Sequence, residues 1–331
     1  MAIDWAPLID VIRSHDRFLL SSHLRPDADA IGSELGLAYA LDQLGKDVRI
    51  VNPSEWPKTL AFLDPEHRCR KLGDGISAEE ARDTDVHIVM DTSSWGQLQE
   101  VGDVFKTSKA AHRAVIDHHV CSDDMGIPVL RDTTAAATGE LIFELCETMG
   151  VDVGPEAATA LYCAIATDTG WFRFPSTTSR TMRIAGELID QGAEPHVLYR
   201  LINEQKTVGR LRLHGRVVGR INLECDGRLG YLTVSLQDYK ETGAIPADTE
   251  DLVNQCLTIA GVEAAFIAIE QPNGNVKVSF RSRLEFNVAE VAALFGGGGH
   301  KQAAGATLPG PLADVLAKVL PPMQQLVTPA S

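Results

Sequence analysis

Short apolar runs alternate with amphipathic segments along the N-terminal part of the chain. The runs that predict strands cover residues 18–22, 48–51, 86–90, 114–116 and 127–130. Apolar positions spaced three and four residues apart predict helices over residues 6–15, 29–45, 135–149, 155–166 and 178–191. Strands that are apolar throughout are typical of sheets buried on both faces. The pattern therefore predicts an α/β fold, with a parallel sheet and helices on both of its faces.

The pattern changes after residue 193. Residues 194–222 predict one long connecting helix, and shorter elements follow it. These are strands over 230–235, 265–270 and 276–281, and helices over 249–260, 288–294 and 311–327. Asn273-Gly274 predicts a hairpin between two of the strands, because Asn-Gly accepts the positive φ of a tight turn. We expect an N-terminal domain over residues 1–193, the connecting helix, and a smaller C-terminal α/β domain over residues 223–331.

Composition narrows the class of protein. At 331 residues, of which 44% are hydrophobic, the chain can bury a large core. Its net charge of −15 argues against a protein that coats long nucleic acid through a broad basic surface. The sequence contains no secretion signal, no apolar stretch long enough to cross a membrane, and no CxxC pair among its six cysteines. These features predict a cytoplasmic location without membrane contact, and they leave open whether the chain is a monomer or a homodimer.

Acidic and histidine residues gather in four clusters, each after an apolar run. The clusters are His23, Asp27 and Asp29; Asp91; Asp117, His118 and His119; and Asp168. Read singly, an aspartate after a strand is often the N-cap of the next helix, and a lone histidine is often structural. Ligands of parallel sheets, however, sit beyond the carboxyl ends of the strands. Four such clusters on one sheet therefore predict a single site.

The residue types in these clusters favour a metal site. Carboxylate oxygens with imidazole suit a divalent ion such as Mn²⁺ better than a thiolate-seeking ion. Four aspartates and one or two histidines exceed the needs of one ion, and they suit two ions about 3.5–4 Å apart bridged by a carboxylate and a hydroxide. Adjacent His118 and His119 on an extended chain would point to opposite sides, one toward metal and the other toward substrate. Phosphate-ester hydrolysis, by in-line attack of the bridging hydroxide, is the expected chemistry.

The C-terminal domain carries a second group of polar residues. Arg281 and Ser282 end a predicted strand, and a run of four glycines leads to His300. Glycines let backbone N–H groups approach an anion, and a helix starting near Gln302 would add its positive end. A flexible loop is the alternative reading of the glycine run. The aromatic residues Trp171, Phe172 and Phe174 could stack on a base or belong to the core.

Taken together, these residues resemble the DHH phosphoesterase superfamily. The resemblance rests on His23-x₃-Asp27-x-Asp29-Ala30, on Asp91, on Asp117-His118-His119 and on Asp168. Arg281-Ser282 and Gly297-Gly298-Gly299-His300-x₃-Ala304-Gly305 resemble the DHH-associated domain of the first type. Within the superfamily, the two-domain length is similar to the NrnA-like group of oligoribonucleases and 3′-phosphoadenosine-5′-phosphate phosphatases. Asp27-Ala28-Asp29 stands where many small members carry Asp-Gly-Asp, and a methyl group should not alter ligation.

The resemblance implies a role for each residue. His23 and Asp27 would hold one ion, Asp29, His118 and Asp168 would hold the other, and Asp91 would bridge them. His119 would face the substrate phosphate and assist the leaving group, while Asp117 would orient a ligand from behind. The residues that would grip a terminal phosphate or base are Arg281, Ser282, Gly297, Gly298, Gly299 and His300. The family favours two Mn²⁺, with Mg²⁺ or Co²⁺ as substitutes.

The expected activity is therefore hydrolysis of short oligonucleotides to mononucleotides and dephosphorylation of 3′-phosphoadenosine-5′-phosphate. The first alternative is a phosphodiesterase for cyclic or linear dinucleotides such as c-di-AMP, pApA or pGpG. A family-II inorganic pyrophosphatase would carry a different second lobe. A RecJ-type exonuclease would need additional nucleic-acid-binding domains, and a non-enzymatic nucleotide sensor would be expected to lack a metal ligand.

Overall fold

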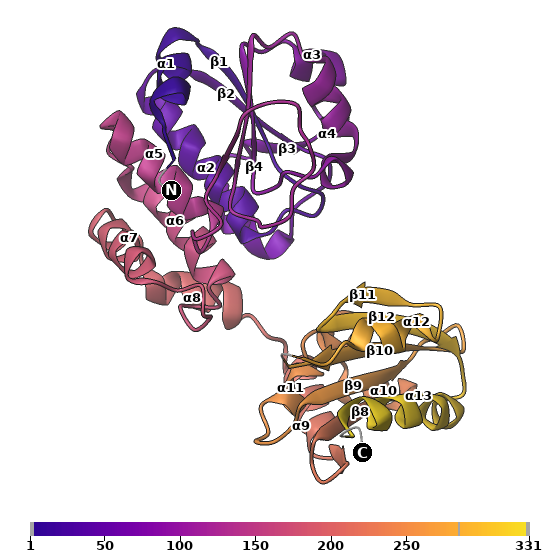
Figure 1. The fold of residues 1–331 in the computed structure, drawn as a ribbon. Helices are drawn as coiled ribbons and strands as arrows, with labels where there is room; N and C mark the ends of the chain where they lie inside the picture. Colours follow the sequence, from indigo (N-terminus) through magenta and orange to yellow (C-terminus); the bar gives the residue numbers. More distant parts are fainter. Residues whose placement is uncertain (1–2, 284, 329–331) are drawn as a thin grey trace. The chain divides into compact units, whose positions relative to one another are not determined.

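The computed structural model describes residues 3–283 and 285–328, and it divides into two compact units between Glu204 and Gln205. The first unit contains a six-stranded sheet with helices on both faces (Figure 1). Its elements are α1 (Ala6–Ser14), β1 (Arg17–Ser21), α2 (Ala28–Gln43), β2 (Asp47–Asn52), η1 (Lys58–Leu63), β3 (Cys69–Lys71), α3 (Ala78–Arg82), β4 (Val86–Met90), α4 (Trp95–Thr107), β5 (His112–Asp117), β6 (Val129–Arg131), α5 (Thr138–Met149), α6 (Gly154–Asp168), α7 (Ser179–Asp190) and α8 (Pro195–Asn203).

The sheet of the first unit has the strand order β3-β2-β1-β4-β5-β6, and every pairing is parallel. The chain moves outward from β1 to β3 and then returns to place β4 on the other side of β1. The carboxyl ends of β1 and β4 are therefore neighbours at the point where the winding reverses, which is where open α/β sheets bind ligands. The predicted α/β class is confirmed.

Successive side chains of β1 point to opposite faces of the sheet, and both faces are buried. Phe18 and Leu20 join the core formed with α1, α2, α5 and α6, whereas Leu19 packs with Val101 and Val104 of α4. Figure 1 shows α3 and α4 on the side of the sheet opposite to α1, α2 and α5. Helices on both faces explain why the strands read as apolar throughout rather than alternating.

Three helices of the first unit approach one another closely because glycine lies at their contacts. A Cβ atom on Gly32 of α2 would lie 2.4 Å from the backbone oxygen of Ala160 in α6. A Cβ atom on Gly139 of α5 would lie 2.8 Å from Cβ of Ala164 in α6. This packing brings the start of α2, the start of α5 and the end of α6 together, and each of these helix ends carries residues of the candidate site.

The second unit is built on a mixed sheet with the order β11-β12-β10-β9-β8-β7. Its elements are α9 (Val208–Val218), β7 (Asn222–Glu224), β8 (Leu229–Val234), α10 (Leu236–Thr242), η2 (Pro246–Thr249), α11 (Asn254–Leu257), β9 (Ala264–Glu270), β10 (Asn275–Ser282), α12 (Val288–Ala293), β11 (Gly298–His300), β12 (Ala303–Pro309) and α13 (Leu312–Val327). β8 pairs with β9 in parallel, and the other pairings are antiparallel. As predicted, Asn273-Gly274 turns the chain between β9 and β10, with Gly274 at φ +81°.

The predicted long connecting helix over residues 194–222 is wrong. The segment forms two helices, α8 and α9, interrupted by the polar residues that follow Asn203. The Thr207 side chain accepts a hydrogen bond from the backbone N–H of Arg210, which caps the start of α9. A side-chain cap of this kind begins a new helix rather than continuing an old one. The two units divide just before this cap.

Two further predicted helices are replaced by other structure. Within residues 249–260 the only α-helix is the short α11, which is preceded by a turn with Asp251 at φ +63°. No helix starts near Gln302, because the following residues form strand β12, whose Ala304, Ala306 and Leu308 alternate into the core. That alternation of small residues has the period of a strand. Among the described residues, no helix is long and apolar enough to cross a membrane.

Candidate metal centre

The segment that follows β1 places three of the predicted residues around the start of α2. The Asp27 carboxylate caps this helix, since its Oδ1 accepts hydrogen bonds from the backbone N–H groups of Asp29 at 3.0 Å and Ala30 at 3.2 Å. Asp29 consequently lies in the first helical turn, where it is 2% exposed. Nε2 of His23 lies 4.0 Å from Oδ1 of Asp27. The N-cap role considered from the sequence is therefore present, and the same carboxylate still faces the histidine.

Asp91 stands at the middle of the candidate site. It follows β4 with φ +61°, a strained backbone conformation for a residue other than glycine, and it is 3% exposed. Its Oδ2 lies 3.4 Å from Nε2 of His23, and its Oδ1 lies 3.6 Å from Nε2 of His118. Thr138 donates its hydroxyl to the same Oδ1 at 2.9 Å. The two oxygens of one carboxylate thus face two different histidines.

A second group forms around His118. Its Nε2 lies 3.7 Å from Oδ2 of Asp29 and 3.6 Å from Oδ2 of Asp168. Asp29 is held in place by the backbone N–H groups of Thr138 at 2.8 Å and Gly139 at 2.9 Å, at the start of α5. Asp168 is the last residue of α6. The expectation that all four clusters lie at strand ends is therefore wrong for Asp168, which reaches the site because α6 packs closely on α2 and α5.

The two histidines that face these carboxylates have their other ring nitrogen engaged. Nδ1 of His23 lies 3.0 Å from the backbone oxygen of Leu24, and Nδ1 of His118 lies 3.3 Å from that of Ala135. A carbonyl oxygen can only accept, so each Nδ1 carries the proton when the imidazole is neutral. This tautomer leaves the Nε2 lone pair of both rings available as a ligand.

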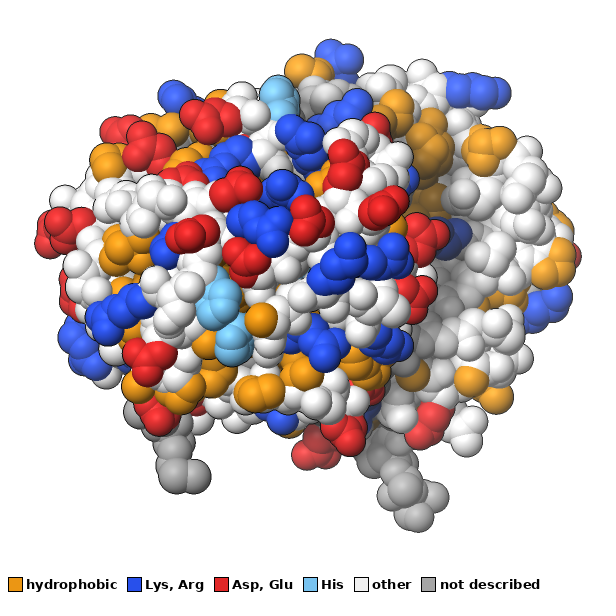
Figure 2. Space-filling model, turned by 90° about the horizontal axis from the view of Figure 1, so that it is seen from above, with side chains coloured by type: hydrophobic (Ala, Val, Ile, Leu, Met, Phe, Trp, Pro, Cys, Tyr) orange, Lys and Arg blue, Asp and Glu red, His pale blue; other side chains and the backbone are white. Residues whose placement is uncertain are grey.

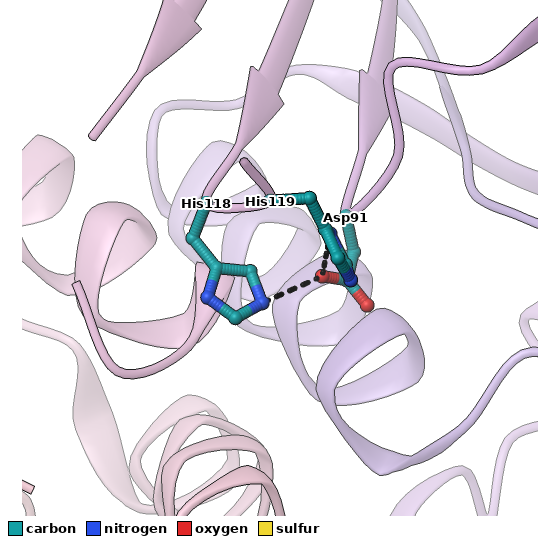
Figure 3. Close-up of side chains that lie close together, drawn as sticks. All are labelled: Asp91, His118 and His119. Atoms are coloured by element: carbon teal, nitrogen blue, oxygen red, sulfur yellow. Dashed lines mark ion pairs between the residues drawn. The ribbon is translucent and has the colours of Figure 1, made fainter. Parts of the chain in front are cut away.

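His119 differs from the other two histidines. Its Nδ1 donates to Oδ1 of Asp117 at 2.9 Å, and Asp117 also accepts the hydroxyl of Ser93 at 2.5 Å. The ring centroids of His118 and His119 are 4.6 Å apart, and Figure 3 shows both rings directed toward Asp91. The expectation that the two histidines point to opposite sides is wrong. β5 ends at Asp117, so the side-chain alternation of a strand does not continue through them.

The site concentrates negative charge away from water. Burial raises the pKa of Asp29 well above its usual value, and repulsion from Asp91, Asp168 and Asp27 raises it further. Burial also raises the pKa of Asp168, as does the charge of Asp91, although His118 opposes this. Burial acts to lower the pKa of His23, but the hydrogen bond to Asp91 and the nearby carboxylates outweigh it and raise the value to about 9. A bound cation would balance this charge.

Among the residues that the structure describes, three groups of side chains have ligand atoms close enough together to hold a metal ion. They are His23, Asp27 and Asp91; Asp29, His118 and Asp168; and Asp91, His118 and His119. Within each group the ligand atoms lie within 4.8 Å of one another. Oxygen and imidazole donors, the free Nε2 lone pairs and the uncompensated carboxylates all fit a hard or borderline divalent cation. The structure brings together all six residues that the sequence proposed as metal ligands.

The polar residues predicted in the second unit are placed on β10 and β11. Arg281 and His300 both lie opposite Ala303 of β12, so they occupy one row of the sheet. Ser282 is buried, and its hydroxyl donates to the backbone oxygen of Phe286 at 2.6 Å. The hydroxyl of Ser282 is therefore engaged in the fold.

The glycine run serves strand pairing rather than a helix terminus. Gly298 and Gly299 lie in β11, and a Cβ atom on Gly297 would lie 2.1 Å from the backbone oxygen of Gly305. At Gly299 a Cβ atom would lie 2.5 Å from the backbone oxygen of Ala303, and its φ is +145°. Glycine at these positions lets β11 approach β12, while Gly298 and His300 remain exposed.

Several residues of the site are absent from the sequence prediction. Thr138 and Gly139 hold Asp29, and Ser93 holds Asp117, through contacts between segments far apart in the chain. Thr138 begins a helix whose start the sequence pattern placed too early, so no local signal marked it. Of the three aromatic residues, Trp171 and Phe172 pack against the core, and Phe174 is exposed.

Comparison with known proteins identifies the family. The model of the DHH family N-terminal domain matches residues 17–165, and that of the DHHA1 domain matches residues 228–328. The bifunctional oligoribonuclease and PAP phosphatase NrnA of Thermus thermophilus is 32% identical over 88% of this chain and 84% of its own length. The chain belongs to the DHH family.

Two other similar proteins extend the comparison for this DHH-family chain. The cyclic-di-AMP phosphodiesterase PdeA of Listeria monocytogenes is 29% identical over 88% of this chain, which corresponds to 45% of PdeA. The crystal structure of an exopolyphosphatase-related protein from Bacteroides fragilis matches with a TM-score of 0.86 and 27% identity, covering 97% of this chain and 95% of that one. Every residue of the three ligand groups described above belongs to one of the DHH motifs proposed from the sequence.

Proposed function

We propose that this DHH-family protein is a phosphoesterase that uses two divalent metal ions to hydrolyse short oligonucleotides and to dephosphorylate 3′-phosphoadenosine-5′-phosphate. One observation carries the proposal: the two oxygens of Asp91 face Nε2 of His23 and Nε2 of His118 at 3.4 and 3.6 Å. A carboxylate between two ligand groups is the arrangement that two-metal sites require. The similarity to NrnA of Thermus thermophilus supports the substrate class.

The proposed ligands divide into two sets. His23 and Asp27 would hold one ion, Asp29, His118 and Asp168 would hold the second, and Asp91 would contribute to both. Bound ions, which we expect to be Mn²⁺, would lower the pKa of water and neutralise the phosphoryl oxygens during in-line displacement. Thr138 and Gly139 keep Asp29 oriented by backbone donation, so its lone pairs are directed into the site. This fixed geometry limits the reorganisation needed during the reaction.

His119 is the proposed proton donor for the leaving oxygen. The Asp117 hydrogen bond raises the pKa of His119, with further support from the charges of Asp91 and Asp168, while burial opposes the shift. A raised pKa keeps more of the imidazole protonated near neutral pH. The side chain of His119 is 53% exposed, so a substrate can reach it. Asp117 is the positioning residue that fixes its tautomer and orientation.

The surface charge supports short substrates. On the face that Figure 2 shows, Lys and Arg side chains are interspersed with Asp and Glu rather than forming a continuous basic track. The net charge is −15. Long nucleic acid binds through many phosphate contacts with cations, whereas a short substrate needs only a local site. The row formed by Arg281 and His300 on the second unit is a separate candidate for binding a phosphate group.

A substrate panel with Mn²⁺ tests the proposal. The panel contains a 5′-phosphorylated dinucleotide, a long oligomer, 3′-phosphoadenosine-5′-phosphate, cyclic di-AMP and pyrophosphate. We expect turnover of the first and third substrates, loss of that turnover in Asp91→Ala, and normal turnover in the exposed control Asp190→Ala. Turnover of pyrophosphate alone would refute the proposal, and near-normal turnover by Asp91→Ala would refute the shared ligand.

The second candidate function is hydrolysis of cyclic dinucleotides. It is favoured by the similarity to PdeA over most of this chain. Faster turnover of cyclic di-AMP than of the linear dinucleotide in the same panel would select it. The same ligand groups would serve both reactions, because each cleaves a phosphodiester.

A further inference from the structure

A cavity of about 360 Å³ opens at the carboxyl ends of β2 and β3. We call it the β2–β3 pocket, and its lining includes Asn52, Ser54, Trp56, His67, Arg70 and Lys71. Because β2 runs parallel to β1, this pocket lies on the same edge of the sheet as the candidate metal centre. None of the residues proposed as metal ligands lines it, so the pocket is additional to the metal centre.

Two hydrogen bonds join the pocket to the loop that carries His23. The backbone N–H of Ser22 donates to Oδ1 of Asn52 at 2.7 Å, and that of Arg25 donates to the hydroxyl of Ser54 at 2.7 Å. A second hydrogen bond fixes the Asn52 side chain, since its Nδ2 donates to Oε2 of the buried Glu34 at 2.8 Å. The wall of the β2–β3 pocket and the loop of His23 are consequently held as neighbours, with Arg25 at a strained φ of +56°.

The cationic groups of the pocket are available to an anion. Arg70 and Lys71 are exposed, and within residues 3–283 and 285–328 neither has a carboxylate within ion-pair distance. The Arg70 guanidinium donates only to the backbone oxygen of Gly75, at 3.3 Å. Glu55 and Asp74 also line the pocket and limit its positive charge. This balance suits one phosphate group better than a polyanion.

The remaining lining suits a nucleoside. Trp56 packs against the core of the first unit and also lines the pocket, and the partly exposed part of its indole offers aromatic surface for a base. Ser54, Glu55 and Asp74 offer acceptors for ribose hydroxyl or base amino groups. A volume of about 360 Å³ falls in the range of small-molecule sites. Cation, aromatic surface and acceptors together fit a nucleoside monophosphate unit.

We propose that the β2–β3 pocket binds the second phosphate-bearing nucleotide portion of the substrate, next to the phosphate held at the metal centre. This inference rests on the proposed function and deepens it. Both proposed substrate classes carry a second phosphate in addition to the one that is cleaved. In pApA and in 3′-phosphoadenosine-5′-phosphate this second group is the 5′-phosphate. In this proposal the pocket binds that second phosphate, so a substrate that lacks it binds more weakly.

The first test compares pApA with ApA, which lacks the terminal phosphate. Lys71→Ala is expected to raise KM for pApA about tenfold, because one charge-assisted contact is lost. It should leave KM for ApA unchanged. Lys71→Arg should retain the preference for pApA. The matched control is Lys109→Ala, which removes the same charge just before β5, at the amino ends of the strands rather than at their carboxyl ends. Equal effects of Lys71→Ala and Lys109→Ala on pApA would overturn the proposal.

The second test separates failure of the pocket from failure of the proposed function. Bis(4-nitrophenyl) phosphate with Mn²⁺ reports phosphodiester cleavage without a second phosphate, and Lys71→Ala should cleave it like the unaltered protein. Binding of 5′-AMP, measured by calorimetry without metal, should weaken about tenfold in Lys71→Ala and not in Lys109→Ala. Unchanged 5′-AMP binding in Lys71→Ala would reject the pocket, whatever the activity of the protein. If the unaltered protein binds 5′-AMP in the pocket but cleaves no phosphate ester, the proposed function alone would be rejected.

Discussion

Oδ1 of Asp117 accepts a hydrogen bond from Nδ1 of His119 at 2.9 Å, and the same carboxylate is held from the other side by Ser93. This pair separates His119 from the two neighbouring histidines of the site, whose Nδ1 atoms face backbone carbonyls. The difference suits different tasks. His23 and His118 have Nε2 available as a ligand atom, whereas His119 is oriented by a carboxylate that raises its pKa.

Asp117→Asn should separate catalysis from metal binding. The amide can no longer stabilise the imidazolium, so the pKa of His119 falls and less of it is protonated at neutral pH. We expect kcat to fall about tenfold to a hundredfold while Mn²⁺ affinity, measured by calorimetry, stays within about twofold. The pH profile should lose activity at a lower pH than in the unaltered protein. Loss of Mn²⁺ affinity equal to the loss of kcat would contradict the positioning role.

The metal-free protein should become less stable as pH rises from about 6.5 to 9. The folded-state pKa of His23 is raised to about 9, above its unfolded value of about 6.5, so its stabilising contribution is complete below the lower value and lost through the upper one. Denaturant titrations at several pH values measure this slope. His23→Gln should flatten it, and saturating Mn²⁺ should stabilise the unaltered protein more than the variant, which lacks a ligand of one of the two proposed ions. A slope unchanged in His23→Gln would contradict the prediction.

Gly32→Ala should disturb the contact between α2 and α6. A methyl group 2.4 Å from the backbone oxygen of Ala160 forces the helices apart and should lower the free energy of unfolding by about 1–3 kcal/mol. Gly186→Ala is the matched control, because Gly186 lies in α7 with no atom within 4 Å of the added Cβ. That control should be neutral or stabilising by up to about 1 kcal/mol. Equal free energies for the two variants would refute the packing argument.

Asp238→Asn should destabilise the second unit. Asp238 is 1% exposed, and it accepts hydrogen bonds from Arg216 Nε at 2.7 Å and Arg220 Nη1 at 2.9 Å. Burial alone would raise its pKa, but the hydrogen bonds from Arg220, Ser235 and Arg216 outweigh this and hold the pKa well below its usual range. Replacing the carboxylate weakens the charge-assisted hydrogen bonds from Arg216 and Arg220, whose side chains are 42% and 38% exposed, and should lower the free energy of unfolding by about 1–3 kcal/mol, measured by denaturant titration.

The same ion-pair cluster has a defined pH dependence. Because the folded-state pKa of Asp238 is depressed, its contribution is present above the unfolded value of about 3.9 and is lost as pH falls through the folded value. Unfolding of the unaltered protein should therefore show an acid-dependent loss of stability that Asp238→Asn lacks. Glu241→Gln is a suitable control, since Glu241 is an exposed partner of Arg216 and Gln237, and the loss of its charge should cost less than about 1 kcal/mol.

Much of the first unit could be predicted from local pattern. The strands at 86–90 and around 18–22 and 48–51 are continuous apolar runs, and the helices between them have apolar positions at helical spacing. The connection between α8 and α9 could also have been read, because Thr207 follows a polar run and is a common N-cap residue. β12 could also have been read from its alternating small residues, which have the period of a strand, but the glycine run before it also suits an anion-binding loop at a helix start.

The sequence by itself determined which residues could form the site. A strand followed by a helix places its last residues at the carboxyl edge of a parallel sheet, so His23, Asp91 and His118 were marked by their positions alone. The tertiary structure decided how they meet. Asp168 comes from the end of α6, Asp29 is held by the start of α5, and Asp91 turns one oxygen to each histidine. These relations depend on helix packing and nonlocal hydrogen bonds, which leave no periodic signal in the chain, because the contacting segments are separated by tens of residues.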